Sequence, residues 1–93
     1  MPKIDIAQIA ERKGSSYPAP HGEPCAARTR KALGDAVGLS DFGVNYLKLP
    51  PGVWSSQRHW HTAEDEFVFV VSGEIVLAFC CATPLLLLLC FLV

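Results

Sequence analysis

Four short segments that favour strand structure, separated by turns, are the feature that most constrains how this 93-residue chain can fold. They cover residues 42–49, 53–61, 66–71 and 75–79, and Ser72-Gly73 forms a tight hairpin turn between the last two. Runs of this length with turn signals between them are typical of an all-β sandwich or barrel, not of a fold that alternates strands and helices. The sequence therefore predicts an all-β domain containing these four strands.

Residues 4–13 predict a different element. They place Ile6, Ile9 and Ala10 on one helical face, and Gly14 follows where a helix C-terminal cap would lie. A short N-terminal helix that docks on a larger body fits this pattern. The next stretch, residues 15–24, contains three prolines and a glycine, which favour extended and turn conformations.

These patterns divide the chain into three parts. Residues 1–24 form an N-terminal helix and a proline-rich arm across the surface, residues 25–77 form the β domain, and residues 78–93 are a hydrophobic tail of uncertain origin. His21, in the arm, is predicted to be an exposed loop residue and not a ligand, because nothing nearby is spaced to assist it.

The charge of the chain argues against nucleic acid as a binding partner. The formal net charge is −1 and the pI is about 6.2, whereas nucleic-acid binding needs clustered basic residues. The basic cluster at residues 28–31 is interpreted as a solvated turn or helix edge, not as a phosphate site. The N-terminus contains acids and no long apolar core, so it does not predict a secretory signal, and a cytoplasmic location is expected.

The four cysteines do not indicate a disulfide framework. Cys25 stands alone, the other three lie in the apolar tail, and no pair has C-x-x-C spacing. Free buried thiols are therefore predicted, in preference to redox or zinc roles.

Two histidines and a glutamate form a candidate metal site. In an extended strand His59 and His61 point to one side and Trp60 points to the other, which places the two imidazoles side by side. Glu66 begins the next apolar run, and a turn before it would bring its carboxylate over the pair. Two nitrogen ligands and one oxygen ligand suit a first-row transition metal with open coordination positions. The simpler alternative is that all three are solvated polar residues.

The parity of residues 66–71 predicts what surrounds this site. If Glu66 faces inward, Val68 and Val70 wall the pocket, and the outward positions are also apolar: Phe67, Phe69 and Val71. A strand with two apolar faces is normally covered on both sides, by another sheet, by the N-terminal arm or by a second subunit. A homodimer is therefore a predicted partner state.

The spacing of Gly52, His59, His61, Glu66 and Gly73 resembles the first conserved motif of the cupin superfamily, with six residues instead of the usual five between Gly52 and His59. The likeness, to small single-domain bacterial cupins, extends from about residue 17 to residue 77. It implies a jelly roll, or double-stranded β-helix, in which the three side chains bind a divalent metal such as Fe, Mn, Zn or Ni.

The second cupin motif, Pro-x-Gly followed by a histidine ligand, is not found, and no histidine follows His61. An incomplete barrel with weak or lost metal binding is therefore expected. The resemblance leaves the reaction and the small-molecule substrate open, because cupins include dioxygenases, isomerases, sugar-binding modules and proteins without chemistry. A non-catalytic ligand-binding or regulatory module is the alternative.

The tail differs in composition from the rest of the chain. All eight basic and nine acidic residues lie within the first 74 positions, and five consecutive leucines follow Pro84. Residues 75–93 would span about 28 Å as a helix, which makes a membrane anchor one interpretation. Prenylation at Cys90 is a weaker one, because valine is an unusual final residue. The favoured hypothesis is a cupin whose end was replaced, for example by a frameshift.

Overall fold

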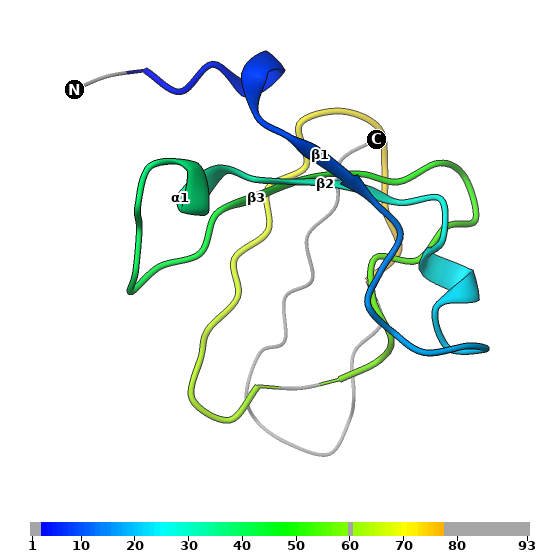
Figure 1. Ribbon diagram of the computed structural model, residues 1–93. Coiled ribbons are helices and arrows are strands. Elements are labelled where there is room, and N and C mark those ends of the chain that lie inside the picture. Colours follow the sequence, from blue (N-terminus) through cyan, green and yellow to red (C-terminus); the bar gives the residue numbers. More distant parts are fainter. Residues whose placement is uncertain (1–2, 60, 78–93) are drawn as a thin grey trace.

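The computed structural model describes residues 3–59 and 61–77, and its centre is a three-stranded antiparallel sheet in the order β1-β2-β3 (Figure 1). The strands are β1 (Glu11–Lys13), β2 (Thr29–Ala32) and β3 (Asn45–Lys48). Three short helical elements accompany them: the 3-10 helices η1 (Ile6–Gln8) and η2 (Glu23–Cys25), and the α-helix α1 (Leu33–Ala36).

The helix predicted over residues 4–13 is wrong except for one turn. The carboxylate of Asp5 accepts a hydrogen bond from the Ala7 backbone N–H (3.1 Å), which caps the single turn of η1. Ile9 is then extended, and residues 11–13 pair with β2. A helix of ten residues is marginal in water, and strand pairing supplies long-range contacts that the helix would lack.

The solvated turn predicted at residues 28–31 is also wrong, because β2 occupies most of this cluster and is the central strand of the sheet. All four β2 residues are half-buried. Lys31 lies opposite Glu11 in the register with β1, so one of the cluster's charges faces a carboxylate across the ladder. Pairing with a strand on each side holds β2 in the sheet, although a run of charged residues favours a solvated segment.

Of the four predicted strands, the first is confirmed in shortened form as β3. Residues 53–59, 66–71 and 75–77 contain no assigned strand, so within the described part of the chain the sheet is open and no closed barrel is present. Strand structure requires a neighbouring ladder of hydrogen bonds, and these segments have no assigned ladder partner among the described residues. The fold shown is thus a small antiparallel β-sheet with long loops.

The predicted alternation along residues 66–71 persists without the strand. Glu66 and Val68 are half-buried, whereas Phe67, Phe69 and Val71 are 79%, 66% and 61% exposed. The pattern therefore identified two of the three predicted inward residues correctly, and Val70, also predicted to face inward, is exposed. It did not identify which part of the protein packs on the outward-facing Phe67, Phe69 and Val71, and the homodimer remains a prediction.

The buried apolar core of the described residues is small. Leu47 and Leu49 form its centre, with Val53 and Ile75 packed against them. The predictions for Trp60 and for the tail, residues 78–93 with its three cysteines, lie outside the described residues. The described residues include no helix with the length and apolar character needed to cross a membrane.

Cys25 is a free thiol and is fully buried, as predicted. Burial raises the pKa of the Cys25 thiol, and the nearby Arg28 guanidinium partly opposes that shift. The side chain therefore acts as a small apolar group in the fold.

We expect Leu47→Ala to destabilise the protein by about 2–4 kcal/mol, because it removes the centre of a small core. Phe67→Ser, at an exposed position, should change the free energy of unfolding by less than about 0.5 kcal/mol. Urea denaturation of the two variants measures both effects. Equal losses would show that residues 66–71 contribute to the core as much as β3 does.

A second prediction concerns the thiol. Because the folded state holds the Cys25 proton more tightly than the unfolded state, this contribution to stability is complete below the ordinary thiol pKa and is lost as the pH rises above it. The free energy of unfolding of Cys25→Ala should consequently fall less steeply at alkaline pH than that of the wild type. Denaturation from pH 7 to 10 tests this, and parallel pH profiles would contradict it.

Candidate metal centre

The N-terminal arm fixes the chain just before the candidate site. The Trp54 backbone N–H donates to the carbonyl of Pro24 (2.9 Å), and the Gln57 side-chain amide donates to the carbonyl of His21 (2.6 Å). The His21 side chain is exposed, as predicted, so this residue contributes to the site through its backbone. The segment that leads into His59 is therefore held by residues thirty or more positions earlier.

Arg28 makes a second connection to the same segment. Its Nε donates to the carbonyl of Gly14 (2.9 Å), and its Nη1 donates to the carbonyl of Ser55, which is buried. One guanidinium thus joins the turn after β1 to the loop after β3. A hydrogen bond from a charged donor to a buried carbonyl is stronger than a neutral one.

Two glycines of the sequence motif occupy turns at which positive φ is needed. Gly52 has φ +77° in a turn closed by a hydrogen bond from the Val53 N–H to the Pro50 carbonyl (3.1 Å), and Gly73 has φ +80°. L-residues with side chains are strained in this region, so the glycines satisfy a backbone requirement at both ends of the site segment.

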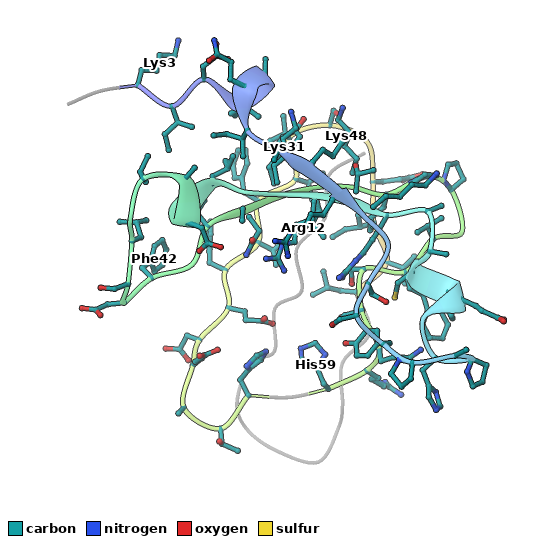
Figure 2. All side chains as sticks on the ribbon, viewed as in Figure 1. Lys3, Arg12, Lys31, Phe42, Lys48 and His59 are labelled. Atoms are coloured by element: carbon teal, nitrogen blue, oxygen red, sulfur yellow. The ribbon has the colours of Figure 1, made fainter. Side chains whose placement is uncertain are left out.

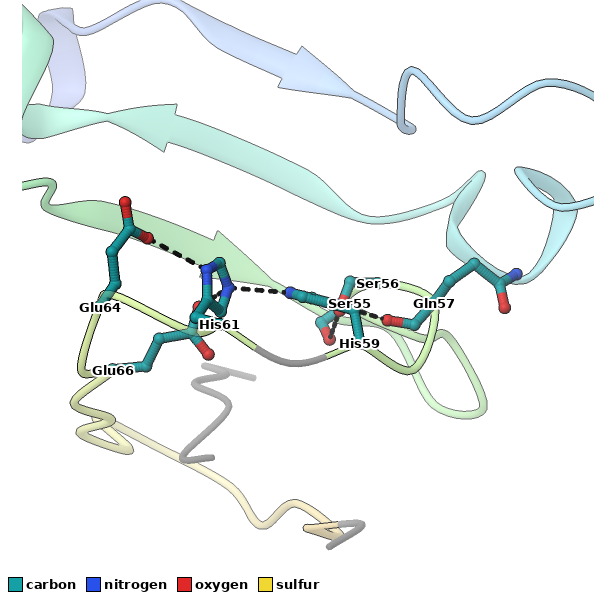
Figure 3. A network of polar contacts seen from close by, with 7 residues as sticks. All are labelled: Ser55, Ser56, Gln57, His59, His61, Glu64 and Glu66. Carbon is teal, nitrogen blue, oxygen red and sulfur yellow. Dashed lines mark hydrogen bonds and ion pairs between the residues drawn. The ribbon is translucent and has the colours of Figure 1, made fainter. Parts of the chain in front are cut away.

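His59, His61 and Glu66 converge, as the sequence predicted (Figure 3). The two Nε2 atoms lie 3.1 Å apart, and His61 Nε2 lies 3.1 Å from Glu66 Oε1. One nitrogen or oxygen atom from each residue lies within 4.8 Å of the others, and all three residues are half-buried. The rings meet edge to face, with centroids 5.0 Å apart and planes at 73°.

The other ring nitrogens have partners that orient the imidazoles. His59 Nδ1 lies 2.7 Å from the carbonyl of Gln57, and His61 Nδ1 lies 3.1 Å from Glu64 Oε2. A carbonyl only accepts, so His59 Nδ1 must carry a proton, and the carboxylate of Glu64 favours the same at His61. In the neutral rings the Nε2 atoms then present lone pairs to each other and to Glu66.

This cluster has more acceptors than donors. Two Nε2 lone pairs and a carboxylate face one another, and the second oxygen of Glu66, Oε2, is buried without a hydrogen-bond partner in the described part of the chain. A buried carboxylate oxygen without a partner is costly. A positive charge placed among these atoms would satisfy all of them at once.

Two of the three separations between the donor atoms fit a transition metal. Ligands about 2.1 Å from one ion are about 3.0 Å apart at right angles and about 3.4 Å apart at the tetrahedral angle. The two 3.1 Å separations lie within that interval. Hydrogen bonding of each Nδ1 to a carbonyl or carboxylate is the usual outer-shell arrangement of metal-bound histidine.

The sequence interpretation missed Glu64 and Gln57. Glu64 lies three residues after His61, a spacing that permits a local contact. Gln57 acts through its backbone carbonyl, to which no side-chain pattern points.

Comparison with protein-family models matches residues 45–80 to the cupin domain. Searches of curated proteins and of solved structures found no match. The matched segment begins at the first residue of β3 and contains all three converging side chains. Residues 45–80 therefore resemble the cupin domain in sequence, and this match covers the segment in which the first cupin motif lies.

Proposed function

We propose that this protein is a metal-binding cupin-type protein, in which His59, His61 and Glu66 hold a divalent transition metal. The convergence of three atoms that can each accept a cation, together with the unpartnered oxygen of Glu66, carries the proposal. Two histidines and a carboxylate are the ligand set of many non-haem iron sites, and Mn, Zn and Ni accept the same donors. When bound, the ion would supply Lewis acidity or redox chemistry at its open positions.

The residues around the site have defined tasks in this proposal. The Gln57 carbonyl fixes the ring of His59, and Glu64 fixes the ring of His61, so both Nε2 atoms face inward before any ion arrives. The hydrogen bonds that the Trp54 backbone N–H and the Gln57 side chain donate to carbonyls of the arm hold the segment that leads to His59. Preorganisation of this kind lowers the entropic cost of binding an ion.

A proton is the competing occupant. A doubly protonated His61 would bridge Glu64 and Glu66 as an imidazolium, and the two His–Glu separations of 3.1 Å permit this. It would leave Glu66 Oε2 unpartnered, whereas an ion can take both oxygens of a carboxylate. The orphaned oxygen therefore favours a metal over a proton.

We expect purified protein incubated separately with Fe(II), Mn(II), Zn(II) and Ni(II) to retain about one ion per chain in at least one case. Elemental analysis after gel filtration measures this. The double variant His59→Ala/His61→Ala should retain none, because it removes both nitrogen ligands. His21→Ala removes the third histidine, which is exposed and outside the cluster, and should retain the wild-type amount. Metal-free wild type, or unchanged metal in the double variant, would refute the metal centre and favour a metal-independent binding module.

Glu64→Ala should weaken metal affinity by about 10-fold, the lower end of the range for outer-shell partners, because Glu64 is largely exposed. Asp65→Ala removes the same charge from the next position and is the matched control. Calorimetric titration of both variants separates the two effects. Equal losses would show that Glu64 acts by general charge and does not orient His61.

A further inference from the structure

Two arginines lie directly opposite each other in the sheet. Arg12 of β1 pairs with Arg30 of β2 in the antiparallel register. Side chains at directly opposed positions have their Cβ atoms about 5 Å apart, and like charges placed there destabilise the sheet. The neighbouring pair, Glu11 of β1 and Lys31 of β2, has opposite charges. The repulsion between like charges therefore belongs to the Arg12–Arg30 pair and not to the register as a whole.

Both arginines are on the sheet face that carries the core. Arg30 lies opposite Leu47 of β3, and directly opposed residues point to the same side of a sheet. Leu47 is buried against Val53 and Ile75. Figure 2 shows the side chain of Arg12 directed to the side of the sheet on which His59 lies. The two arginines therefore lie on the same face of the sheet as Leu47, where Arg30 is half-buried and Arg12 is exposed.

A cavity of about 360 Å³ lies at this position. Its polar lining consists of Gln8, Arg12, Arg30 and Asp35, and the remainder is alanine and isoleucine. Within residues 3–59 and 61–77 neither arginine has a hydrogen-bond or ion-pair partner for its side chain, and Asp35 forms no ion pair with either. Two positive groups and one negative group leave the cavity with a net positive charge.

We propose that this cavity binds a small anion through a carboxylate or phosphate group held between Arg12 and Arg30. The planar guanidinium fork matches both groups, which accept two parallel hydrogen bonds. The Gln8 amide supplies a further donor from the cavity wall. An anion between the guanidiniums converts a repulsive cross-strand pair into two attractive contacts.

The charge and volume of the cavity also exclude other classes of ligand. A cation would meet two positive charges, and a nucleic acid requires a broad basic surface that two arginines on a chain of net charge −1 do not provide. The volume fits a small molecule and not a polymer. The site is separate from the proposed metal centre and does not require it.

Thermal unfolding of the full chain, metal-free, in phosphate, malonate or chloride at equal ionic strength tests the proposal. The midpoint should rise with phosphate, with malonate or with both, relative to chloride, and the anion that acts identifies the recognised group. Binding to the native state raises the midpoint by linkage, whereas screening acts equally in all three salts and the general stabilisation by phosphate persists in Arg12→Gln. Equal midpoints in the three salts would overturn the proposal.

Substitutions at three positions test whether the anion binds in this cavity. Arg12→Gln should weaken the affinity for the active anion by about 10- to 100-fold, as expected for hydrogen bonds to a charged group. Lys13→Gln, the same charge change one residue later on the opposite face of β1, should leave it unchanged. Asp35→Asn should strengthen binding, because it removes the one acid of the cavity.

The Nε–H resonances of wild-type Arg12 and Arg30 provide a readout that needs no variant. They should shift on titration with the active anion and remain unchanged with chloride. Unshifted resonances, or equal loss of affinity in Arg12→Gln and Lys13→Gln, would place the anion elsewhere and refute the site.

Discussion

The hydrogen bonds of Arg28 are the interaction on which the rest of the structure depends. Its guanidinium joins the carbonyls of Gly14 and Ser55, one from the turn after β1 and one from the loop that leads to the site. The buried apolar core of the described residues contains few side chains, so hydrophobic contact alone does little to hold these loops. A charged donor that reaches two backbone acceptors supplies directional contacts where apolar area is lacking.

The candidate metal centre follows from this arrangement. Because the arm fixes residues 54–57, the Gln57 carbonyl is in place to accept from His59, and the two imidazoles converge without regular strand structure. In a complete β-sheet the ladder would perform this task. Here backbone carbonyls and a glutamate orient the ligands, which is why residues outside the motif matter to its geometry.

The sequence predicted the site better than the fold. The spacing of His59, His61 and Glu66 and the inward parity of Glu66 and Val68 depend on local backbone extension, and these features are confirmed. The failures involve pairing. Residues 11–13 looked helical in isolation and residues 28–31 looked solvated, but each forms a strand because the other is its partner. A contact between segments this far apart along the chain leaves no periodic signal in either one.

Ligand binding and stability are closely coupled in a chain with so small a core. An ion or anion present at one hundred times its dissociation constant stabilises the native state by about 2.7 kcal/mol. That is comparable to the burial of one large core side chain, about 1.5–3 kcal/mol. Both proposed sites gather like charges or unpaired acceptors, which destabilise the unliganded fold: the guanidiniums of Arg12 and Arg30, and the acceptors of His59, His61 and Glu66. Occupying either site removes that cost and adds the binding energy, so the liganded form should be distinctly more resistant to unfolding than the free chain.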